Sequence, residues 1–558
     1  MSNLPSNPNP VPEASTQNPV IAWVDRNILD LGRQFRLSYL PPLMVYLSAG
    51  ISGLTGIVGT FFVKEYLGLS AEFLAALGFW MMLPWTLKMP MGHLVDLYWH
   101  HKAKLIYLGA SLIGVSLLIM VGLLAHPAEM RDVMPMETWF VLSSLLAPVG
   151  YVVQDVVADA MTVEAVPRFD EEGKPLPEEQ TRLSHTTMQT LGRVAIIGGT
   201  LLVALANVYL FSGVEKLDMA QKAEVYLTIY RLALVIPLVS VFGVFSAAGL
   251  RWRDAQRLAA QGLELEEINR LLDRPIDELT TANPWILGGG LGFVVFSIAI
   301  GLSSVPFSEE IVFAGSLGIV LFLIWRLTLE LDVTARNTLF GTAVVIFVFR
   351  AMPSPGAGSS WWMIDVLGFD QQFLAKLSLL TSALALFGMF MFRRYMAEHS
   401  ITDIMRFLTI TLTFLSLPNI AMYYGFHEWT AAHTGGVVDA RFIALIDTAL
   451  ESPLGQVAMI PMLAWIAHSA PSHLKATFFA VMAAFTNLAL SLAQLSTKYL
   501  NQIFTVTRDI KDKTSGAVVT PADYSELGFL FIAVTLIGLV LPLLAIFIVK
   551  RTLLSASK

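Results

Sequence analysis

Residues 155–164, DVVADAMTVE, place three carboxylates inside a long apolar segment. Asp155 and Asp159 are four residues apart, so a helix would present both side chains on one face. A charge that faces lipid costs several kcal/mol, so we expect this acidic face to point toward other helices. A carboxylate in such a place can carry a proton or accept hydrogen bonds from a solute.

The next apolar segment offers a basic partner for these acids. Gln189 and Arg193 are also spaced by four residues. At 1.5 Å per residue, Asp155 and Arg193 would both lie roughly 10 Å from the inner ends of their helices. We predict an ion pair or a water-bridged contact between Asp155 and Arg193. Two roles remain open for this pair: a structural bridge between helices, or part of a gate or solute site.

The second half of the chain repeats the pattern of a buried cation near a helix break. Arg350 ends the apolar run VVIFVFR, and Pro353 and Pro355 follow at once. Proline removes a backbone donor and breaks a helix. A broken helix beside a cavity is a common binding device in transporters. We therefore predict a solute or gating role for Arg350 and a hinge at the two prolines.

Asp447 and Glu451 form a second pair of acids with a four-residue spacing, in IDTALESPLGQ. Asp447 would lie roughly 9 Å from the outer face, which matches the depth of Arg350. Glu451 would lie nearer the midplane, and it is the acid that we most readily assign to a proton or to solute. Alternatively, this helix begins later, which would leave Asp447 in a wet interface.

A loop that follows the second apolar segment has the sequence GHLVDLYWHHK, residues 92–102. Gly92 and Asp96, followed by basic residues, resemble the loop signature of the major facilitator superfamily. Asp96 could sit beside the N-terminus of a neighbouring helix and hold one side of a transporter closed. The alternative is an ordinary loop with a glycine turn. We expect no metal site here, because His100 and His101 lack a third ligand nearby.

Composition indicates an integral membrane protein. Of 558 residues, 55% are hydrophobic and only 14% are charged, whereas soluble proteins have about 25% charged residues. The mean hydropathy is +0.64. No cysteine is present, which excludes disulfides and thiolate sites. The histidines do not form HExxH or a similar cluster, so we expect no enzyme, no catalytic residues and no cofactor.

The chain contains about fourteen apolar runs near the twenty residues that a helix needs to cross a bilayer. Spanning segments must satisfy their backbone groups internally, so we predict an all-α polytopic fold. The predicted spans are 40–62, 72–95, 103–125, 138–161, 186–210, 226–249, 284–305, 310–331, 336–352, 373–396, 403–425, 441–467, 474–500 and 526–549.

Basic residues gather in alternate loops, which sets the orientation. These loops are predicted to be cytoplasmic, together with both termini, in a multi-pass protein of the cell inner membrane. The loop 501–525 is an exception, since it carries Arg508, Lys511 and Lys513 on the predicted outer face. The predicted parts are a tail (1–39), a six-helix bundle (40–249), a linker (250–283) that reads as a charged amphipathic helix pair, two extra helices (284–331), a second six-helix bundle (336–550) and a tail (551–558).

Several of these segments resemble the folate–biopterin transporter family of the major facilitator superfamily. They are QDVVADAMTVE (154–164), FRAMPSPGAGSSWWMIDVLGF (349–369), ESPLGQVAMIPMLAWIAHSAP (451–471) and TFFAVMAAFTN (477–487). The resemblance implies two six-helix bundles, pteridine solutes such as folate or biopterin, and coupling to protons. It points to these residues: Asp155, Asp159, Glu164, Gln189, Pro353, Gln456, Pro461 and Asn487. The two extra spans and the charge of Arg350 depart from the family pattern, which bears on the identity of the solute.

Together, these features lead us to expect a monomeric secondary active transporter of a small anionic aromatic metabolite, driven by protons. A cavity arginine could hold a carboxylate bidentately. The same fold could instead carry a peptide, S-adenosylmethionine or a tetrapyrrole, or the chain could be a membrane assembly factor that transports nothing. Its partners would be the solute, protons and the lipid bilayer, and not nucleic acid.

Overall fold

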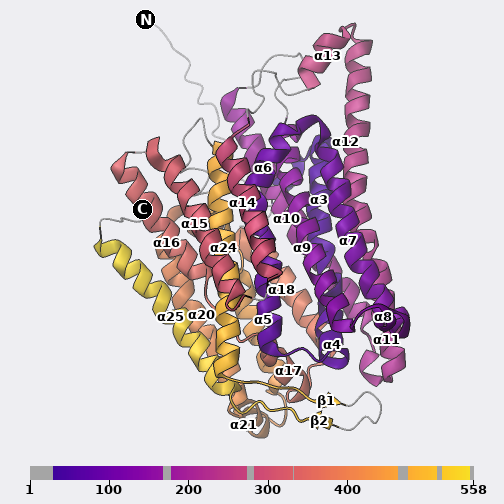
Figure 1. Ribbon diagram of the computed structural model, residues 1–558, viewed down its shortest axis with the longest axis vertical. Helices are drawn as coiled ribbons and strands as arrows, with labels where there is room; N and C mark the ends of the chain where they lie inside the picture. The colour runs from indigo at the N-terminus through magenta and orange to yellow at the C-terminus, as the bar shows by residue number, and fades with distance from the viewer. Residues whose placement is uncertain are drawn as a thin grey trace, which may run out of the picture.

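The structure is a computed structural model that describes residues 25, 29–166, 177–272, 282–303, 305–330, 332–462, 475–511 and 518–552. Long helices run side by side along the longest axis of the molecule (Figure 1). Apolar residues dominate these helices because backbone groups within a bilayer must find their partners inside the helix.

The first half is entirely helical where it is described. Its helices are α2 (Asp30–Arg33), η2 (Leu37–Tyr39), α3 (Leu40–Ile51), η3 (Ser52–Thr55), α4 (Gly56–Tyr66), α5 (Ala71–Met82), η4 (Leu83–Leu87), α6 (Lys88–Leu97), η5 (Trp99–His101), α7 (Lys102–Ala125), α8 (Pro127–Val133), α9 (Met136–Ala165), α10 (Glu178–Leu210), η6 (Val214–Lys216), α11 (Met219–Ala233) and α12 (Val235–Ala260).

The rest of the chain adds a second set of helices and one small sheet. The helices are α13 (Leu265–Leu272), α14 (Pro284–Gly301), α15 (Ser308–Leu327), η8 (Thr328–Glu330), α16 (Val333–Arg350), α17 (Ala357–Asp365), α18 (Gln371–Met391), α19 (Arg393–Glu398), α20 (Ile401–Tyr423), α21 (Phe426–His433), α22 (Ala440–Glu451), η9 (Ser452–Leu454), α24 (Lys475–Ile503) and α25 (Leu527–Arg551). The antiparallel strands are β1 (Ile510–Lys511) and β2 (Val518–Thr520).

Within the described residues, 12 helical segments are long and apolar enough to cross a membrane. Two predicted spans, 72–95 and 474–500, are not among them. The first corresponds to α5, η4 and α6, where Pro84 and Pro90 interrupt the apolar run; the second corresponds to α24. A total of fourteen spans therefore stays a prediction.

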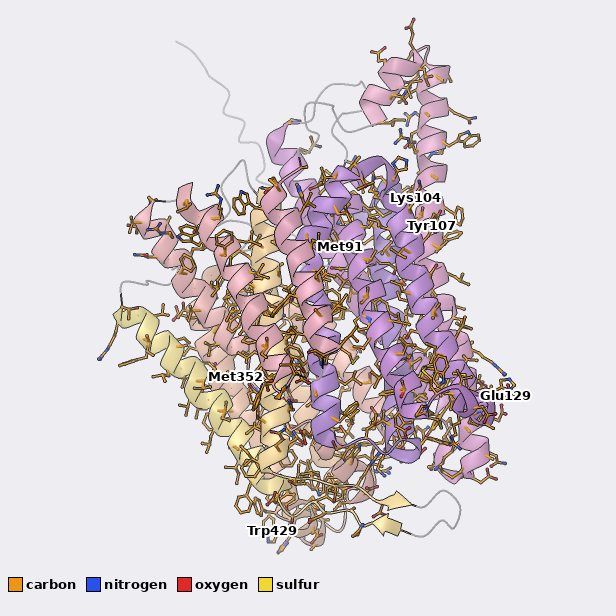
Figure 2. All side chains as sticks on the ribbon, viewed as in Figure 1. Met91, Lys104, Tyr107, Glu129, Met352 and Trp429 are labelled. Carbon is orange, nitrogen blue, oxygen red and sulfur yellow. The ribbon has the colours of Figure 1, made fainter. Side chains whose placement is uncertain are left out.

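The two ends of the bundle differ, and we name them by what they carry. The linker face carries α13 and the end of α12, and Lys104 lies toward it (Figures 1 and 2). The hairpin face carries β1, β2, α17 and α21, and Trp429 lies there (Figures 1 and 2).

The predicted helix pair in the linker differs from the observed helices, because α12 extends to Ala260 before α13 begins. The all-helical expectation also missed the hairpin, whose strands of two and three residues are too short to show alternation.

The two extra helices pack across the junction of the two halves rather than at its edge. Helix α14 contacts α6, and α15 contacts α24. A Cβ on Gly290 would meet the ring of Pro90 on α6, and one on Gly301 would lie 2.7 Å from the Trp80 ring. Glycine therefore allows the close approach of α14 to the broken second span.

Glycine also sets the crossing of α3 and α10. A Cβ on Gly199 would lie 2.9 Å from the Cα of Gly50, and the ring of Tyr46 lies at a similar distance from a Cβ on Gly192. Gly192 and Gly199 therefore allow the close packing of α3 and α10.

Gly199→Ala is expected to destabilise the protein by roughly 1–3 kcal/mol, because the added methyl group overpacks two backbones. Gly198→Ala is the matched control, since nothing lies within 4 Å of its Cβ position. The thermal midpoint in detergent should fall for the first variant and stay or rise for the second. Equal midpoints would contradict the close crossing.

Candidate functional site

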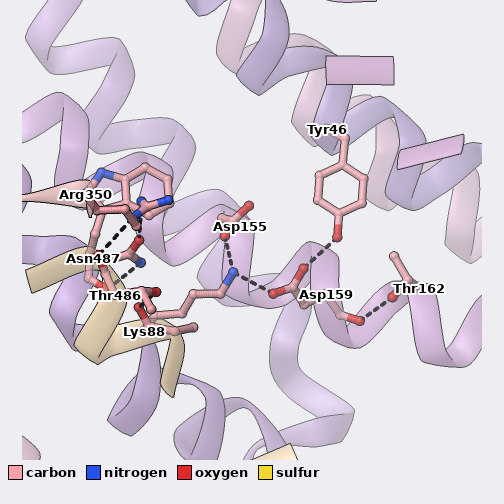
Figure 3. A network of polar contacts seen from close by, with 10 residues as sticks. Tyr46, Lys88, Asp155, Asp159, Thr162, Arg350, Thr486 and Asn487 are labelled. Atoms are coloured by element: carbon pink, nitrogen blue, oxygen red, sulfur yellow. Dashed lines mark hydrogen bonds and ion pairs between the residues drawn. The ribbon is translucent and has the colours of Figure 1, made fainter. Parts of the chain in front are cut away.

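A lysine lies between the two acids of the DVVADA segment (Figure 3). Lys88 Nζ is 2.6 Å from Asp155 Oδ2 and 2.8 Å from Asp159 Oδ2. The hydroxyl of Tyr46 donates to Asp159 Oδ1 at 2.6 Å. Three helices, α3, α6 and α9, thus meet in one polar network, and the expectation that the acidic face points toward other helices is confirmed.

A direct ion pair between Asp155 and Arg193, one of the two predicted contacts, is wrong, whereas the water-bridged contact stays a prediction. Both side chains are described, and Lys88 rather than Arg193 holds the carboxylate. Depth matching compared only neighbouring segments of the sequence, whereas Lys88 comes from the second span. Lys88 lies well inside the predicted span 72–95, and a lysine at such a depth is itself a signal of a buried partner.

Arg193 nevertheless belongs to the same region. Its positive charge acts on Asp155 and Tyr46, and also on Arg350 from the other half. Within the described part of the chain, neither arginine makes an ion pair with a carboxylate. Two guanidinium groups from opposite halves therefore lie near enough to act on each other electrostatically.

Arg350 is held by α24. Its Nε donates to the carbonyl of Thr486 at 3.0 Å, and Nη2 lies 3.5 Å from Asn487 Oδ1 (Figure 3). The Asn487 amide lies 3.5 Å from the carbonyl of Trp85, next to the helix that carries Lys88. Asn487 thus lies between Arg350 of the second half and the segment of the first half that precedes Lys88.

Two glutamines, Gln154 and Gln189, have different surroundings near the acidic network. Gln154 is buried, and its amide donates to Ser240 Oγ at 2.8 Å, on the side of α9 away from the acids. Gln189 is exposed and lies 3.4 Å from Thr162 Oγ1, whose hydroxyl donates to the carbonyl of Asp159. Gln189 therefore lies beside the acidic network, as a member of the site would.

The second acidic pair lies apart from Arg350. Asp447 is only 7% exposed, and Asn419 donates to its Oδ2 at 3.0 Å. Helix α22 begins at Ala440, so the alternative of a late start with Asp447 in a wet interface is wrong. Glu451, one turn further, is exposed and acts electrostatically on Asp447. Asp447 and Arg350, expected at matching depth, have different neighbours.

The predicted break after Arg350 is confirmed. Helix α16 ends at that residue, and the next helix, α17, begins only at Ala357. Gly356 has φ +75°, a conformation that glycine adopts readily. Thr497 accepts from the backbone amide of Ser354, and Asn501 donates to the carbonyl of Pro355. Helix α24 thus braces the segment with Pro353 and Pro355.

The segment 92–102 is helical rather than an open loop. Gly92 and Asp96 lie in α6, which ends at Leu97 near the linker face. Lys102 pairs with Glu164 at 3.0 Å, which ties α7 to the end of α9. The gating role of Gly92 and Asp96 stays a prediction.

Two cavities lie outside this network. One of about 610 Å³ lies between α14 and α15, and one of about 420 Å³ lies between α10 and α18 beside α2. Neither is lined by the residues of Figure 3. The side chains of the network itself are partly exposed. Asp159 is 38% exposed, whereas Asp155 and Lys88 are each 18% exposed. Among the residues that the structure describes, no group of three His, Asp or Glu could hold a metal ion.

Comparisons with known proteins agree with this architecture. Residues 311–556 match the BT1 family. A folate-biopterin transporter of Synechocystis is 21% identical over 462 residues, which cover 82% of this chain and 74% of the relative. A structure from work on substrate recognition in proton dependent oligopeptide transporters shares 15% identity at a TM-score of 0.52, over 92% of this chain and 98% of that chain. A bacterial homologue of the human drug peptide transporters has a TM-score of 0.53 and 15% identity, over 93% and 98% of the two chains.

At such identities the solved structures establish the fold alone, and the family match covers less than half of the chain. Residues 311–556 are therefore similar to the BT1 family, and the chain as a whole has the fold of the solved transporters that it matches.

Proposed function

We propose that the protein is a secondary active transporter that moves a small anionic aromatic metabolite, of the folate or pterin kind, in symport with protons. Residues 40–249 and 336–550 form the two bundles, joined by the linker 250–283 and the helices of 284–331. The bundles open alternately to each side of the cell inner membrane. The transporter acts as a monomer with both termini in the cytoplasm.

The pair Arg193 and Arg350 is the observation that carries the proposal. The two guanidinium groups act on each other across the two halves, and no described carboxylate pairs with either. Like charges repel, so an anion between them relieves this repulsion and bridges the halves. Guanidinium binds carboxylate bidentately, which suits a solute with an acidic tail.

The acidic side of the site complements the other end of such a solute. Asp159 keeps exposed surface although Lys88 and Tyr46 bind it, and exposed Gln189 lies nearby. A carboxylate accepts hydrogen bonds from the donors on a pterin edge, and an amide can both donate and accept. The similarity to a folate-biopterin transporter supports this class of solute.

The remaining residues receive roles by position. Asp155 is the deeper acid of the lysine network, and Asp447 and Glu451 are the candidates for proton coupling. Gly92 and Asp96 lie at the linker face, where they would contribute to a gate, and Pro353 and Pro355 would form a hinge. The linker face is taken as cytoplasmic because the basic loops lie on that side.

Uptake into proteoliposomes tests the proposal. Labelled folates, pterins, peptides and S-adenosylmethionine should each be offered with and without a pH gradient. We expect uptake of a folate or pterin that the gradient stimulates. Uptake of peptides alone, or no uptake of any solute by folded protein, would overturn the proposed solute.

Arg350→Ala and Arg193→Ala are each expected to lower uptake efficiency roughly 10- to 100-fold, because each loses a charge-assisted contact to the solute. Membrane abundance should remain near that of the native protein. Arg253→Ala is the control, because Arg253 is exposed and pairs with Asp254 at the linker face. Normal uptake by either cavity variant would remove that arginine from the site.

A further inference from the structure

Arg508 belongs to a segment outside the spanning helices, yet it is only 3% exposed. Its guanidinium donates to the backbone carbonyls of Val63 and Leu67, where α4 of the first half ends. The same group lies 4.9 Å from the centre of the Trp361 ring on α17. A guanidinium at a helix C-terminus binds orphan carbonyls and meets the negative end of the helix dipole.

A second contact between the halves lies beside Arg508. Lys64 Nζ on α4 lies 2.5 Å from Asp365 Oδ1 on α17, and the hydroxyl of Tyr524 donates to Asp365 Oδ2 at 2.5 Å. Burial, followed by the hydrogen bond to Asp365, raises the pKa of Tyr524 well above its ordinary value. Tyr524 therefore remains a donor at physiological pH, and Asp365 is held from both halves.

Residues 504–511 and 518–526, which include Arg508 and Tyr524, are held together by hydrogen bonds. Thr507 and Asp523 exchange two backbone hydrogen bonds of 3.0 Å, and β1 pairs with β2 beyond them. Glu526 accepts from the backbone amide of Thr505 at 2.7 Å. Val506 packs on α17 so closely that a Cβ on Gly358 would lie 2.8 Å from it. Residues 504–511 and 518–526 thus form a braced unit that packs on the second half.

We propose that residues 504–511 and 518–526 form a latch that holds the hairpin face closed, with the Arg508 side chain bound to the end of α4 in the first half. The hairpin face opens only when the Arg508 guanidinium leaves the end of α4 and Lys64 separates from Asp365. This assignment also accounts for a basic residue on the predicted outer face, because Arg508 neutralises carbonyl dipoles instead of facing solvent. The latch requires only that the halves move, and it holds whichever solute is carried.

The absence of cysteine from the chain makes the latch directly testable. Lys64→Cys with Asp365→Cys places two thiols across the latch, and a short bifunctional thiol reagent should join them. The control pair, Asp370→Cys with Arg441→Cys, replaces an ion pair of 2.7 Å within the second half. A third cysteine, Gln189→Cys, reports access to the site through its reaction with an impermeant maleimide.

We expect the cross-linked latch to block labelling of the reporter from the hairpin-face side, while labelling from the linker-face side continues. Cleavage of the cross-link should restore access, and the control cross-link should change neither rate. A Val437→Cys variant, exposed between α21 and α22, identifies which side of the vesicle is the hairpin face. Undiminished labelling of the cross-linked protein from the hairpin-face side would overturn the proposal.

Arg508→Ala supplies the opposite test. Loss of the charge-assisted contacts should raise reporter labelling from the hairpin-face side about tenfold or more, and Arg508→Lys should fall between. An unchanged rate in folded Arg508→Ala protein would also overturn the proposal. Because the reporter needs no solute, failure of the latch is distinguishable from failure of the proposed transport function.

Discussion

Lys88→Ala is expected to abolish transport and to lower the amount of folded protein, because it leaves two acids without their cation. Lys88 lies 2.6 Å from Asp155 and 2.8 Å from Asp159, and its side chain is 18% exposed. Removing one partner of a buried ion pair costs roughly 3–5 kcal/mol. Membrane abundance, the size-exclusion profile and uptake per folded molecule measure the two effects separately.

Two further variants distinguish the effect of Lys88 on folding from its effect on transport. Lys88→Ala combined with Asp155→Asn should recover part of the folded protein but not uptake, because Asp155 no longer needs a cation whereas the more exposed Asp159 still lacks one. Lys102→Ala is the matched control at the C-terminal end of α9, where Glu164 is 38% exposed and the expected effect is within about 1 kcal/mol. If Lys88→Ala protein were as abundant and as active as native protein, the network would carry neither role.

The lysine network shows which features of the site could be predicted from the sequence and which could not. Asp155 and Asp159 were predicted to share an inward face, because a four-residue spacing and the cost of charge in lipid leave little choice. Their partner was missed because it comes from a different span. Spacing fixes which face a side chain occupies, whereas the neighbour of that face depends on how distant helices pack.

Arg508 and Arg350 show the same limit from two sides. The loop pattern placed Arg508 on the predicted outer face, and the structure shows that its side chain is buried against the end of α4. For Arg350, the following prolines correctly marked the end of α16. They gave no information on its neighbours, since Thr486 and Asn487 lie more than a hundred residues later in the chain. The sequence therefore predicts a local feature such as the end of a helix. It does not predict which residues of the other half the side chain will contact, because that depends on the tertiary structure.

The two acidic pairs of the site differ in what balances them, and this suggests a division of labour. Asp155 and Asp159 share a lysine, so one of their two negative charges is compensated by a cation in direct contact. Asp447 has an amide neighbour, Asn419, and within the described residues no cation contacts it; its Oδ1 lacks a hydrogen-bond partner. An ionised carboxylate buried without a cation is strongly disfavoured, so this site favours a neutral, proton-bearing acid.

Asp447→Asn is therefore expected to uncouple transport from protons while leaving the solute pathway intact. Asparagine has the shape of the protonated acid and preserves a hydrogen bond with Asn419. A gradient of one pH unit is worth about 1.4 kcal/mol per proton, enough for roughly tenfold accumulation of solute. The variant should lose this accumulation in proteoliposomes but still exchange labelled for unlabelled solute across the membrane.

Glu451→Gln decides between the two acids of α22. Glu451 is exposed whereas Asp447 is buried, and the charge of Glu451 acts on Asp447 without a hydrogen bond between them. Glu451→Gln should therefore keep gradient-driven accumulation, although its rate can change. If instead Glu451→Gln lost accumulation and Asp447→Asn kept it, the proton would be assigned to the wrong acid. Burial would then not be the property that selects the coupling residue.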